Sequence, residues 1–532
     1  MKTANNHLTK NDQFSTTNQL TTHDNFMASI SHLTFHIEYK MKKINTFLLA
    51  ALLLSGASCK DYLEEDTTGL LYGNNVLSTQ DGLESALTGA YKGLASQWSR
   101  GFIHPSANAA TLGSDDVTTH PASNKADWRE FDQFNVSTTN QRSNAVYNGC
   151  YKAIQGANNV INNYEKTVGD KAAIDIIVGE AHFIRAFSYY WLTRFWGNIP
   201  LVLAGEYSAD LLSIGKSTPE QVYELIVADL KVAETNLPNN KRDPGRPNKG
   251  SAKAYLADVY LTMAGWPLKQ TDKYDLAAAK AKEVIDNKAA YGFQLLPTFA
   301  AVFENDPAST GTAEAVFQIN GFTSGDSGNS TYGLTTMPGE EGGWDDMYAE
   351  LNFFNNFPAG PRKDATFRTE FGLSGTKIPW QNSLTKHPYY KKWYIKGDIS
   401  TYQASLPSVM MRYAHVLTIY AEAKARGTGG PDQAAYDALN QIRLRGRVAG
   451  TKPLSAADGL TAARFADEVV QERAWEFACE RTRWFDLVRL EKVEEANANK
   501  SPDDLQPIRA ITKANYWFPL PYSDTSLNPN LN

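Results

Sequence analysis

Apolar and small residues recur at helical spacing along most of the chain, and this spacing is the main structural signal in the sequence. It predicts helices over residues 75–98, 145–164, 172–196 and 219–236. The third helix ends before Gly197, with Pro200 beyond it, which is a typical stop signal. The fourth follows Thr218, a capping residue, and has Pro219 in its first turn. The pattern therefore predicts a mainly helical protein.

Three pairs of segments have the pattern of helix–turn–helix units. They comprise 172–196 with 219–236, Ser251–Gly265 with Tyr274–Asn287, and Met410–Arg426 with Pro431–Arg445. In the second pair, Ala254 and Ala257 face a segment that carries Ala277 and Ala281. Small residues at helix crossings and Tyr at helix ends resemble tetratricopeptide repeats, although long insertions interrupt a regular spacing. We expect a mainly α fold in which TPR-like pairs form a solenoid scaffold.

Residues 290–405 break the helical pattern and are rich in Gly, Pro and aromatic residues. Between Trp344 and Tyr394 there are 12 aromatic residues in 51, about twice the 11% of the whole chain. A loop-rich insertion of this length in a compact protein usually carries function. We therefore expect the functional surface in this part of the chain.

The beginning of the chain has the pattern of a targeting segment. Residues 1–40 are polar and without a clear period, so we expect a disordered extension or residues that the native protein lacks. From Met41, two Lys precede the apolar run 47–54, which is too short for a bilayer and fits a signal peptide over 41–58. The small residues that end in Cys59 resemble the lipobox of bacterial lipoproteins, although Gly56 replaces the usual Leu or Val. Ordinary signal cleavage, with Cys59 incidental, is the alternative.

Composition excludes several functional classes. The 532 residues carry 52 basic and 58 acidic side chains, a net charge of −6, so the chain lacks the basic footprint of a nucleic-acid binder. Its 11 Trp, 26 Tyr and 24 Phe exclude disorder for the bulk of the chain. No CxxC motif occurs, and the five His after Cys59 form no HxxxH pair, so we expect no metal site and no cofactor.

Several motifs resemble those of the SusD/RagB family, in family order. They are 185–202, 411–423 (MRYAHVLTIYAEA), 439–445 (LNQIRLR), 472–489 (with ER, EF, RW, DL and R) and 519–529. Gly446-Arg447 departs from the Ala-Gly that the pattern has at that place. The resemblance covers nearly all of 59–532 and implies one SusD-like glycan-binding domain.

This resemblance also implies a location and a partner. It implies a lipoprotein anchored through Cys59 to the outer membrane. The acidic segment 61–66 resembles a signal for export to the cell surface, with a solvated tether as the alternative. There it would bind an oligosaccharide or polysaccharide and sit as a lid on a SusC-like TonB-dependent transporter. The expected role is glycan capture for nutrient uptake, without catalysis.

One acidic row resembles a catalytic cluster. Glu472, Glu476 and Glu480 are four residues apart, which places them on one face of a helix. Arginines at 473, 481, 483 and 489 interleave with them and favour ion pairs over a carboxyl of raised pKa. We interpret the row as structural.

Sugar recognition needs flat rings for the apolar C–H face of a sugar and polar groups for its hydroxyls. The tryptophans in or beside Gly/Ser/Pro-rich loops are the candidates, with neighbouring polar residues: Trp98, Asp115, Asp116, Trp128, Trp344, Tyr348, Trp380 and Trp393. Trp128 and Trp344 are the first choices. Asp115 and Asp116 have a further interpretation as Ca²⁺ ligands or as a structural loop pair. The remaining tryptophans, in helical or family motifs, are assigned to the core: Trp191, Trp196, Trp266, Trp475, Trp484 and Trp517.

Two alternatives remain open from the sequence. A surface glycoside hydrolase needs two carboxylates across a cleft, and Glu340, Glu341, Asp345 and Asp346 are the acids available near Trp344. Neighbouring residues rarely converge on one bond. The second alternative is a scaffold whose aromatic residues are all buried against a transporter.

Overall fold

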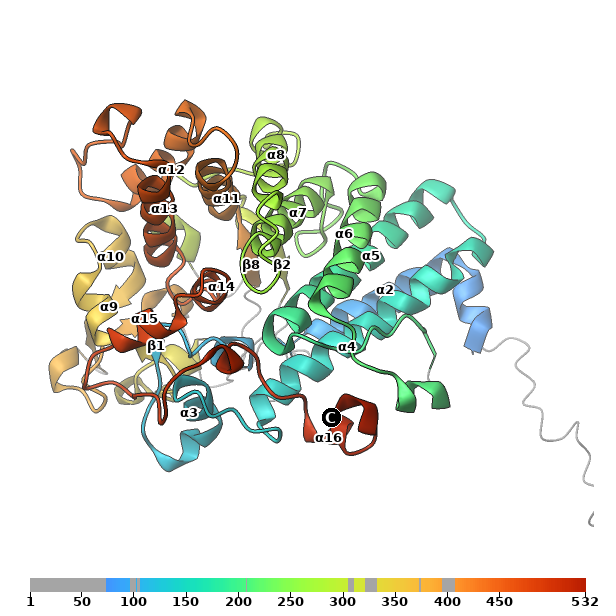
Figure 1. Ribbon diagram of the computed structural model, residues 1–532, viewed down its shortest axis with the longest axis horizontal. Helices are drawn as coiled ribbons and strands as arrows, with labels where there is room; N and C mark the ends of the chain where they lie inside the picture. Colours follow the sequence, from blue (N-terminus) through green and yellow to red (C-terminus); the bar gives the residue numbers. More distant parts are fainter. Residues whose placement is uncertain are drawn as a thin grey trace, which may run out of the picture. The chain divides into compact units, whose positions relative to one another are not determined.

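The computed structural model describes residues 73–95, 102, 106–206, 208–304, 311–320, 333–372, 375–394 and 407–532. Helices dominate this part of the chain (Figure 1). The predicted signal peptide, Cys59 and Trp98 lie outside the described residues.

The first half of the described chain contains the four helices that the periodicity predicts. They are α2 (Gln80–Leu94), α4 (Gln141–Asn163), α5 (Lys171–Trp196) and α6 (Pro219–Asn236). Side chains of Thr79, Asn140, Asp170 and Thr218 cap them by accepting from first-turn N–H groups. α2 begins later than the spacing indicated, because Gly73–Ser78 forms a separate 3₁₀ helix before the cap.

The helices pack in pairs. α5 packs on α6, α7 (Lys249–Met263) on α8 (Lys273–Asp286), and α11 (Tyr413–Arg426) on α12 (Gln433–Gly446). α8 also packs against α11, so the row of pairs continues across the insertion between them. In Figure 1 the row runs from α2 on the right to α12 on the left. The predicted mainly α fold with TPR-like pairs is confirmed.

The insertion contains short elements where it is described. Antiparallel strand pairs join β1 (Val117–Thr118) to β3 (Tyr348–Ala349), β4 (Phe367–Arg368) to β7 (Tyr389–Tyr390), and β5 (Glu370–Phe371) to β6 (Ile378–Pro379). Helices α9 (Leu351–Asn356) and α10 (Pro361–Thr366) lie between β3 and β4 along the chain.

Two longer strands, one within the insertion and one just after it, pair with each other. β2 (Ala315–Ile319) pairs antiparallel with β8 (Ser408–Arg412). The helix predicted from Met410 therefore begins only at Tyr413, because the residues before it are extended and donate to β2 instead.

The last quarter of the chain runs back over the first. α13 (Ala462–Glu476) packs on α11 and leads to α14 (Arg483–Arg489) and α15 (Val493–Ala498). The segment that follows ends in α16 (Tyr522–Thr525) and a 3₁₀ turn. The N–H of Phe518 donates to the carbonyl of Phe195 at 2.7 Å, and that of Tyr522 to Thr138, just beyond α3 (Ala126–Asp132), at 2.9 Å. The two ends of the described chain thereby share one core.

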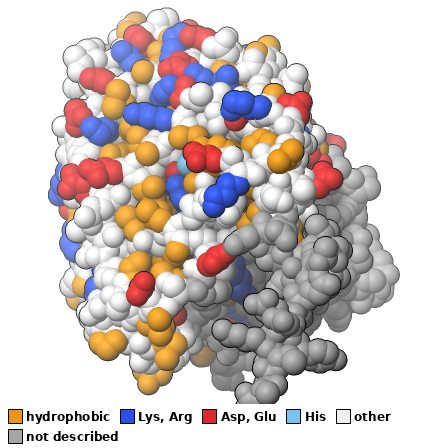
Figure 2. Space-filling view, turned by 90° about the vertical axis from the view of Figure 1, so that its right-hand side faces the viewer, with side chains coloured by type: hydrophobic (Ala, Val, Ile, Leu, Met, Phe, Trp, Pro, Cys, Tyr) orange, Lys and Arg blue, Asp and Glu red, His pale blue; other side chains and the backbone are white. Residues whose placement is uncertain are grey.

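Residues Gly73–Asn532 form a single compact unit. Its two described cysteines, Cys150 and Cys479, are free and buried, and no disulfide joins them. None of the described helices is long and apolar enough to span a membrane. On the face shown in Figure 2, acidic and basic side chains are interspersed, without a wide region of one sign.

Candidate functional site

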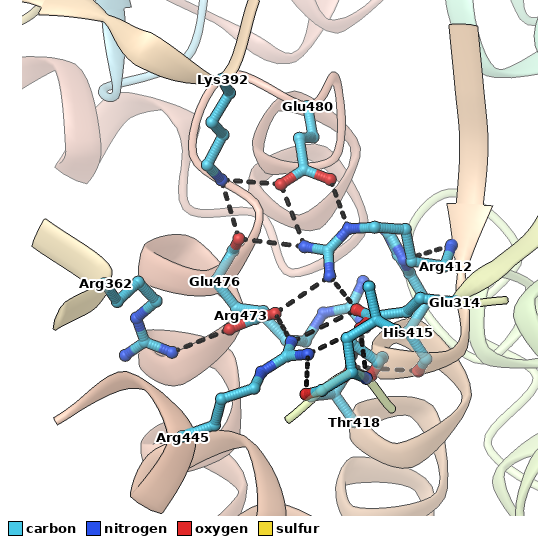
Figure 3. Close-up of polar contacts among 12 residues, drawn as sticks. Glu314, Arg362, Lys392, Arg412, His415, Thr418, Arg445, Arg473, Glu476 and Glu480 are labelled. Atoms are coloured by element: carbon cyan, nitrogen blue, oxygen red, sulfur yellow. Dashed lines mark hydrogen bonds and ion pairs between the residues drawn. The ribbon is translucent and has the colours of Figure 1, made fainter. Parts of the chain in front are cut away.

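The acidic row of the sequence lies in a buried network of ion pairs (Figure 3). The carboxylate of Glu476 accepts from Arg362 at 3.0 Å, Arg412 at 3.0 Å and Arg445 at 2.6 Å. Glu480 accepts from Arg412 at 2.8 Å and from the ammonium of Lys392 at 2.6 Å. All six side chains are nearly or fully buried. The network joins α13 to α10, α12 and β8.

The electrostatics of this network exclude a proton donor at neutral pH. Burial by itself would raise the pKa of Glu476, but Arg445, Arg412 and Arg362 hold it far below its usual range. Burial would also raise the pKa of Glu480, but Arg412 and Lys392 outweigh it and lower this pKa to about 2. Both carboxylates are therefore ionised, as the structural interpretation requires.

The partners differ from those that the sequence predicted. α13 ends at Glu476, so Glu480 lies in the turn that follows and not on the same helix. The interleaved arginines bind other acids: Arg473 and Arg489 pair with Asp486, and Arg483 pairs with Asp115. The expectation of local pairs along one helix is wrong, because the guanidinium groups that reach Glu476 come from three other elements.

Three of the aromatic residues predicted to contact a sugar are buried. Trp128, on α3, is 1% exposed, and Trp393 is 4% exposed with its Nε1 donating to the carbonyl of Cys479 at 3.1 Å. Tyr348 is 2% exposed and lies against His387, with ring centroids 4.5 Å apart. The expectation of open ring faces is wrong for these residues, since other side chains cover them. Their loop context does not report the direction in which a ring points.

The two predicted acids of the 115–116 pair are engaged within the protein. The guanidinium of Arg483 donates to both oxygens of Asp115 at 2.6 and 2.7 Å. Asp116 accepts from the hydroxyl of Ser114 and from the N–H of Cys479 at 2.7 Å, and burial raises its pKa. Both acids therefore have a structural role here. Among the described residues, no group of three His, Cys, Asp or Glu side chains could hold a metal ion.

Trp344 and Trp380 are the predicted tryptophans that are partly exposed in the described chain. Trp344 follows a hydrogen-bonded 3₁₀ turn, Gly339–Glu341, although its Gly-rich sequence would suggest a flexible segment. Asp345 adopts a φ of 52° and its carboxylate accepts from the N–H of Gly339 at 2.7 Å. Trp380 meets Phe354 edge to face at 5.8 Å.

The acids of the hydrolase alternative are used to fix this loop. Glu341 accepts from Arg368 at 2.5 Å, and Glu340 accepts from the N–H of Leu384 at 2.7 Å. Asp346 is 3% exposed and pairs with Lys125. Burial raises the pKa of Asp346 to about 6 against the effect of that ammonium. None of these carboxylates lines the cavity beside the C-terminal segment, so no two of them face each other across it.

That cavity, of about 650 Å³, lies where α3, α5 and α14 meet the C-terminal segment. Its lining includes rings of Phe134, Trp196, Trp484, Trp517 and Phe518 and the polar side chains of Asn135, Asn198, Lys216, Arg509 and Asn515. Sequence reasoning missed this site, since it assigned all three tryptophans to the core. A usable signal was present: three asparagines stand within two residues of an aromatic residue, at 134–135, 196–198 and 515–517.

Two family models match the chain. One, described as the SusD family, matches residues 368–532, and the other, described as starch-binding associating with outer membrane, matches residues 61–261. The chain belongs to the SusD/RagB family. These matches cover the helices α2, α4, α5 and α6 at one end of the row and α11, α12 and α13 at the other.

Relatives of this SusD/RagB chain extend over its length. A SusD-like protein P2 of Formosa agariphila is 28% identical over 520 residues, 92% of this chain and 99% of that protein. Among solved structures, surface glycan-binding protein A of Bacteroides fluxus superposes with a TM-score of 0.69 at 21% identity, covering 85% of this chain and 97% of that one. A laminarin binding SusD-like protein does so with 0.68 at 22%, covering 85% and 98%. The structural likeness shows the fold.

Proposed function

We propose that this SusD-family chain is a lipid-anchored protein of the outer membrane that captures oligosaccharides at the cell surface and delivers them to a SusC-like TonB-dependent transporter. The observation that carries the proposal is the match to a family model described as starch-binding associating with outer membrane. Structural neighbours described as glycan-binding and laminarin binding support the same class of ligand.

Trp344 and Trp380 are the described parts of the proposed binding surface. Each keeps partial exposure on a backbone that hydrogen bonds hold in place. A ring fixed in this way meets the C–H face of a sugar with little loss of side-chain entropy. Trp98 belongs to the same proposal from its sequence context and lies outside the described residues.

The acidic side chains that could serve a hydrolase are held in ion pairs and hydrogen bonds, which favours glycan binding over hydrolysis. Glycosidases need one carboxyl to donate a proton and a second to attack or to activate water. Around Trp344, Glu341 and Asp346 are instead paired with cations, and Asp345 binds the N–H of Gly339. In α13, Glu476 is held ionised by three arginines.

A glycan-array screen of the chain from Lys60 onward tests this function, because the compact unit begins at Gly73 and is retained. Bound oligosaccharides recovered without cleavage support the proposal. Shortened products would make the protein a hydrolase, and the absence of binding across neutral and charged glycans would favour a transporter scaffold. Thermal unfolding of the same sample reports whether the protein is folded.

A further inference from the structure

We propose that the cavity between α3, α5, α14 and the C-terminal segment is a second binding site, which takes a saccharide unit that carries an anionic group. Neither Trp344 nor Trp380 lines this cavity. The site is therefore distinct from the surface proposed for glycan capture, and it can be tested separately.

The size and walls of the cavity suit a small molecule. Its volume of about 650 Å³ lies within the range of about 300–1,000 Å³ that ligand pockets have. Phe518 is stacked on Phe195 with centroids 5.0 Å apart and runs parallel to Trp484 at 6.4 Å. Rings packed in this way do not have to be ordered when a ligand enters, which lowers the entropic cost of binding.

Trp517 is fixed by a close contact with the backbone. A Cβ at Gly197 would lie 2.6 Å from its ring, and Gly197 has a φ of 65°, so only glycine allows this approach without strain. The ring of Trp517 also packs against that of Trp266, with ring centroids 4.7 Å apart. Trp196 donates from Nε1 to the carbonyl of Pro519 at 3.1 Å and holds the C-terminal segment beside it. The aromatic wall is thus already formed without a ligand.

A buried donor in the lining has no partner. Trp484 is 1% exposed, and its Nε1 has no hydrogen-bond acceptor within the described part of the chain. An unpaired buried N–H loses its hydrogen bond to water without a replacement, so native structures rarely keep one. A hydroxyl, carboxylate or sulfate oxygen of a ligand in the cavity would supply an acceptor.

The charged groups of the lining favour an anion. Lys216 and Arg509 line the cavity, whereas no Asp or Glu side chain does. Lys216 donates to main-chain oxygens of Leu531 at 3.3 Å and Asn532 at 3.0 Å, so its charge is partly used. Arg509 donates to the neutral amide of Asn135 and forms no ion pair within the described residues. Its guanidinium is therefore the group that would bind a carboxylate or sulfate.

The amides complete the recognition of a sugar. Asn135 and Asn198 are exposed at the edge of the cavity, and Asn515 is half-buried in its lining. Amide groups can donate to and accept from hydroxyls, and aromatic walls suit the C–H faces of a pyranose. A uronate or sulfated sugar combines these features with the negative charge that Arg509 would pair.

Calorimetric titration of the chain from Lys60 tests the site with three probes: tri-galacturonate, the same trisaccharide after reduction of its carboxyl groups, and a sulfated neutral trisaccharide. We expect at least one charged probe to bind more tightly than the reduced one. Arg509→Gln should weaken that binding by about tenfold to a hundredfold, as loss of a charged hydrogen bond does. Arg464→Gln removes an exposed arginine on α13 that does not line the cavity, and this control should change the affinity less than twofold.

A second variant and a soaked crystal locate the ligand. Thr138→Trp places a large ring at the exposed edge of the cavity and should abolish binding of the charged probe without changing the thermal midpoint. Density for the probe beside Arg509 and Trp484 would support the proposal. It fails if all three probes bind equally, if Arg509→Gln behaves as Arg464→Gln, if none of the probes binds, or if the density lies at Trp344. The array result for neutral glycans is unaffected by these outcomes, so the proposed function stands or falls separately.

Discussion

Trp128 and Trp344 differ in what surrounds their rings, and the same substitution should separate their roles. Trp128→Ala removes a fully buried ring and should lower the free energy of unfolding by about 3–5 kcal/mol. Trp344→Ala alters a partly exposed ring and should leave folding nearly unchanged while weakening glycan binding by about 1–3 kcal/mol. Chemical denaturation and calorimetric titration measure the two effects. A Trp344→Ala protein that stays folded and binds as tightly as wild type would exclude Trp344 from the binding surface.

A second residue-scale effect concerns His415 and pH. Burial, together with Arg412 and Arg473, lowers the pKa of His415 to about 3, so it is neutral in the folded protein. Below its unfolded pKa of about 6.5 the unfolded chain takes up a proton that the folded one does not. Between pH 6.5 and pH 3 the free energy of unfolding should therefore fall by about 1.4 kcal/mol for each pH unit of acidification. Above about pH 6.5 the full contribution of neutral His415 to stability is present.

The variant His415→Gln isolates this contribution. Its amide can keep the bond in which the ring Nδ1 accepts from the N–H of Arg412 at 3.0 Å, but it does not titrate. We expect the wild type to lose stability more steeply than the variant between pH 6.5 and pH 5 in urea denaturation at each pH. Equal slopes for the two proteins would show that His415 titrates normally when folded.

The exposure of single tryptophans was the least predictable part of the site. Trp128 and Phe131 stand three residues apart on α3, a helical spacing that indicates a buried face, while the surrounding loop composition suggested the opposite. Trp393 is covered by Cys479, 86 residues later in the chain, which no local pattern can indicate. Trp517 was assigned to the core and yet lines the cavity, because a framework residue can also form a wall.

At the scale of elements, α12 is coupled to α10 at Gly446. A Cβ at this position would lie 2.7 Å from the guanidinium carbon of Arg362, which is fully buried and paired with Glu472 and Glu476. This contact explains why the chain has Gly where the family pattern has Ala. Gly446→Ala should destabilise the protein by about 1–3 kcal/mol, more than the gain of about 0.5–1 kcal/mol from better helix propensity. Thermal unfolding checks the sign, and a raised midpoint would contradict the predicted clash.

Asp486 couples its own helix, α14, to two other helices. On α14, it accepts from Arg473 of α13 at 2.8 Å and from Arg489, whose guanidinium also donates to Glu422 of α11 at 2.6 Å. Asp486→Ala leaves two buried guanidinium groups without this acceptor and should cost about 3–5 kcal/mol. Arg464→Gln, on the exposed face of α13, is the matched control and should change stability by less than about 0.5 kcal/mol. If Asp486→Ala melts normally but loses glycan binding, Asp486 belongs to a site and not to the framework.

Helices were predictable from the sequence where a single apolar face runs for several turns. α4 and α6 have this pattern, whereas α5 is buried nearly all round; Asn140, Asp170 and Thr218 cap the three helices. β8 was not predictable, since its five residues adjoin a helix and their extended state depends on pairing with β2. In that pairing Arg412 lies opposite Ala315, 97 residues earlier in the chain. The ion-pair partners of Glu476 lie up to 114 residues away and follow from tertiary packing alone.

At the scale of the whole molecule, the C-terminal segment closes the unit over α5 and α3. Main-chain bonds from Phe518 to Phe195 and from Tyr522 to Thr138 join the last residues to the first helices. The same segment supplies Trp517 and Arg509 to the proposed anionic-sugar site. The family motifs at the two ends of the sequence therefore form one folded body, which is why their order along the chain was informative for the fold.

Attachment of this body to the membrane is expected to depend on Cys59. Acyl chains contribute about 0.8 kcal/mol for each buried CH₂, so several chains on one residue hold a large domain firmly. No helix in the described part of the chain is able to span a membrane and replace them. Cys59→Ala should therefore move the protein from the outer-membrane fraction to the soluble periplasm and abolish labelling with a palmitate analogue. Ser55→Ala, which keeps the run of small residues, should leave both unchanged. Membrane association and labelling that survive Cys59→Ala would show that this residue is not the site of lipid attachment.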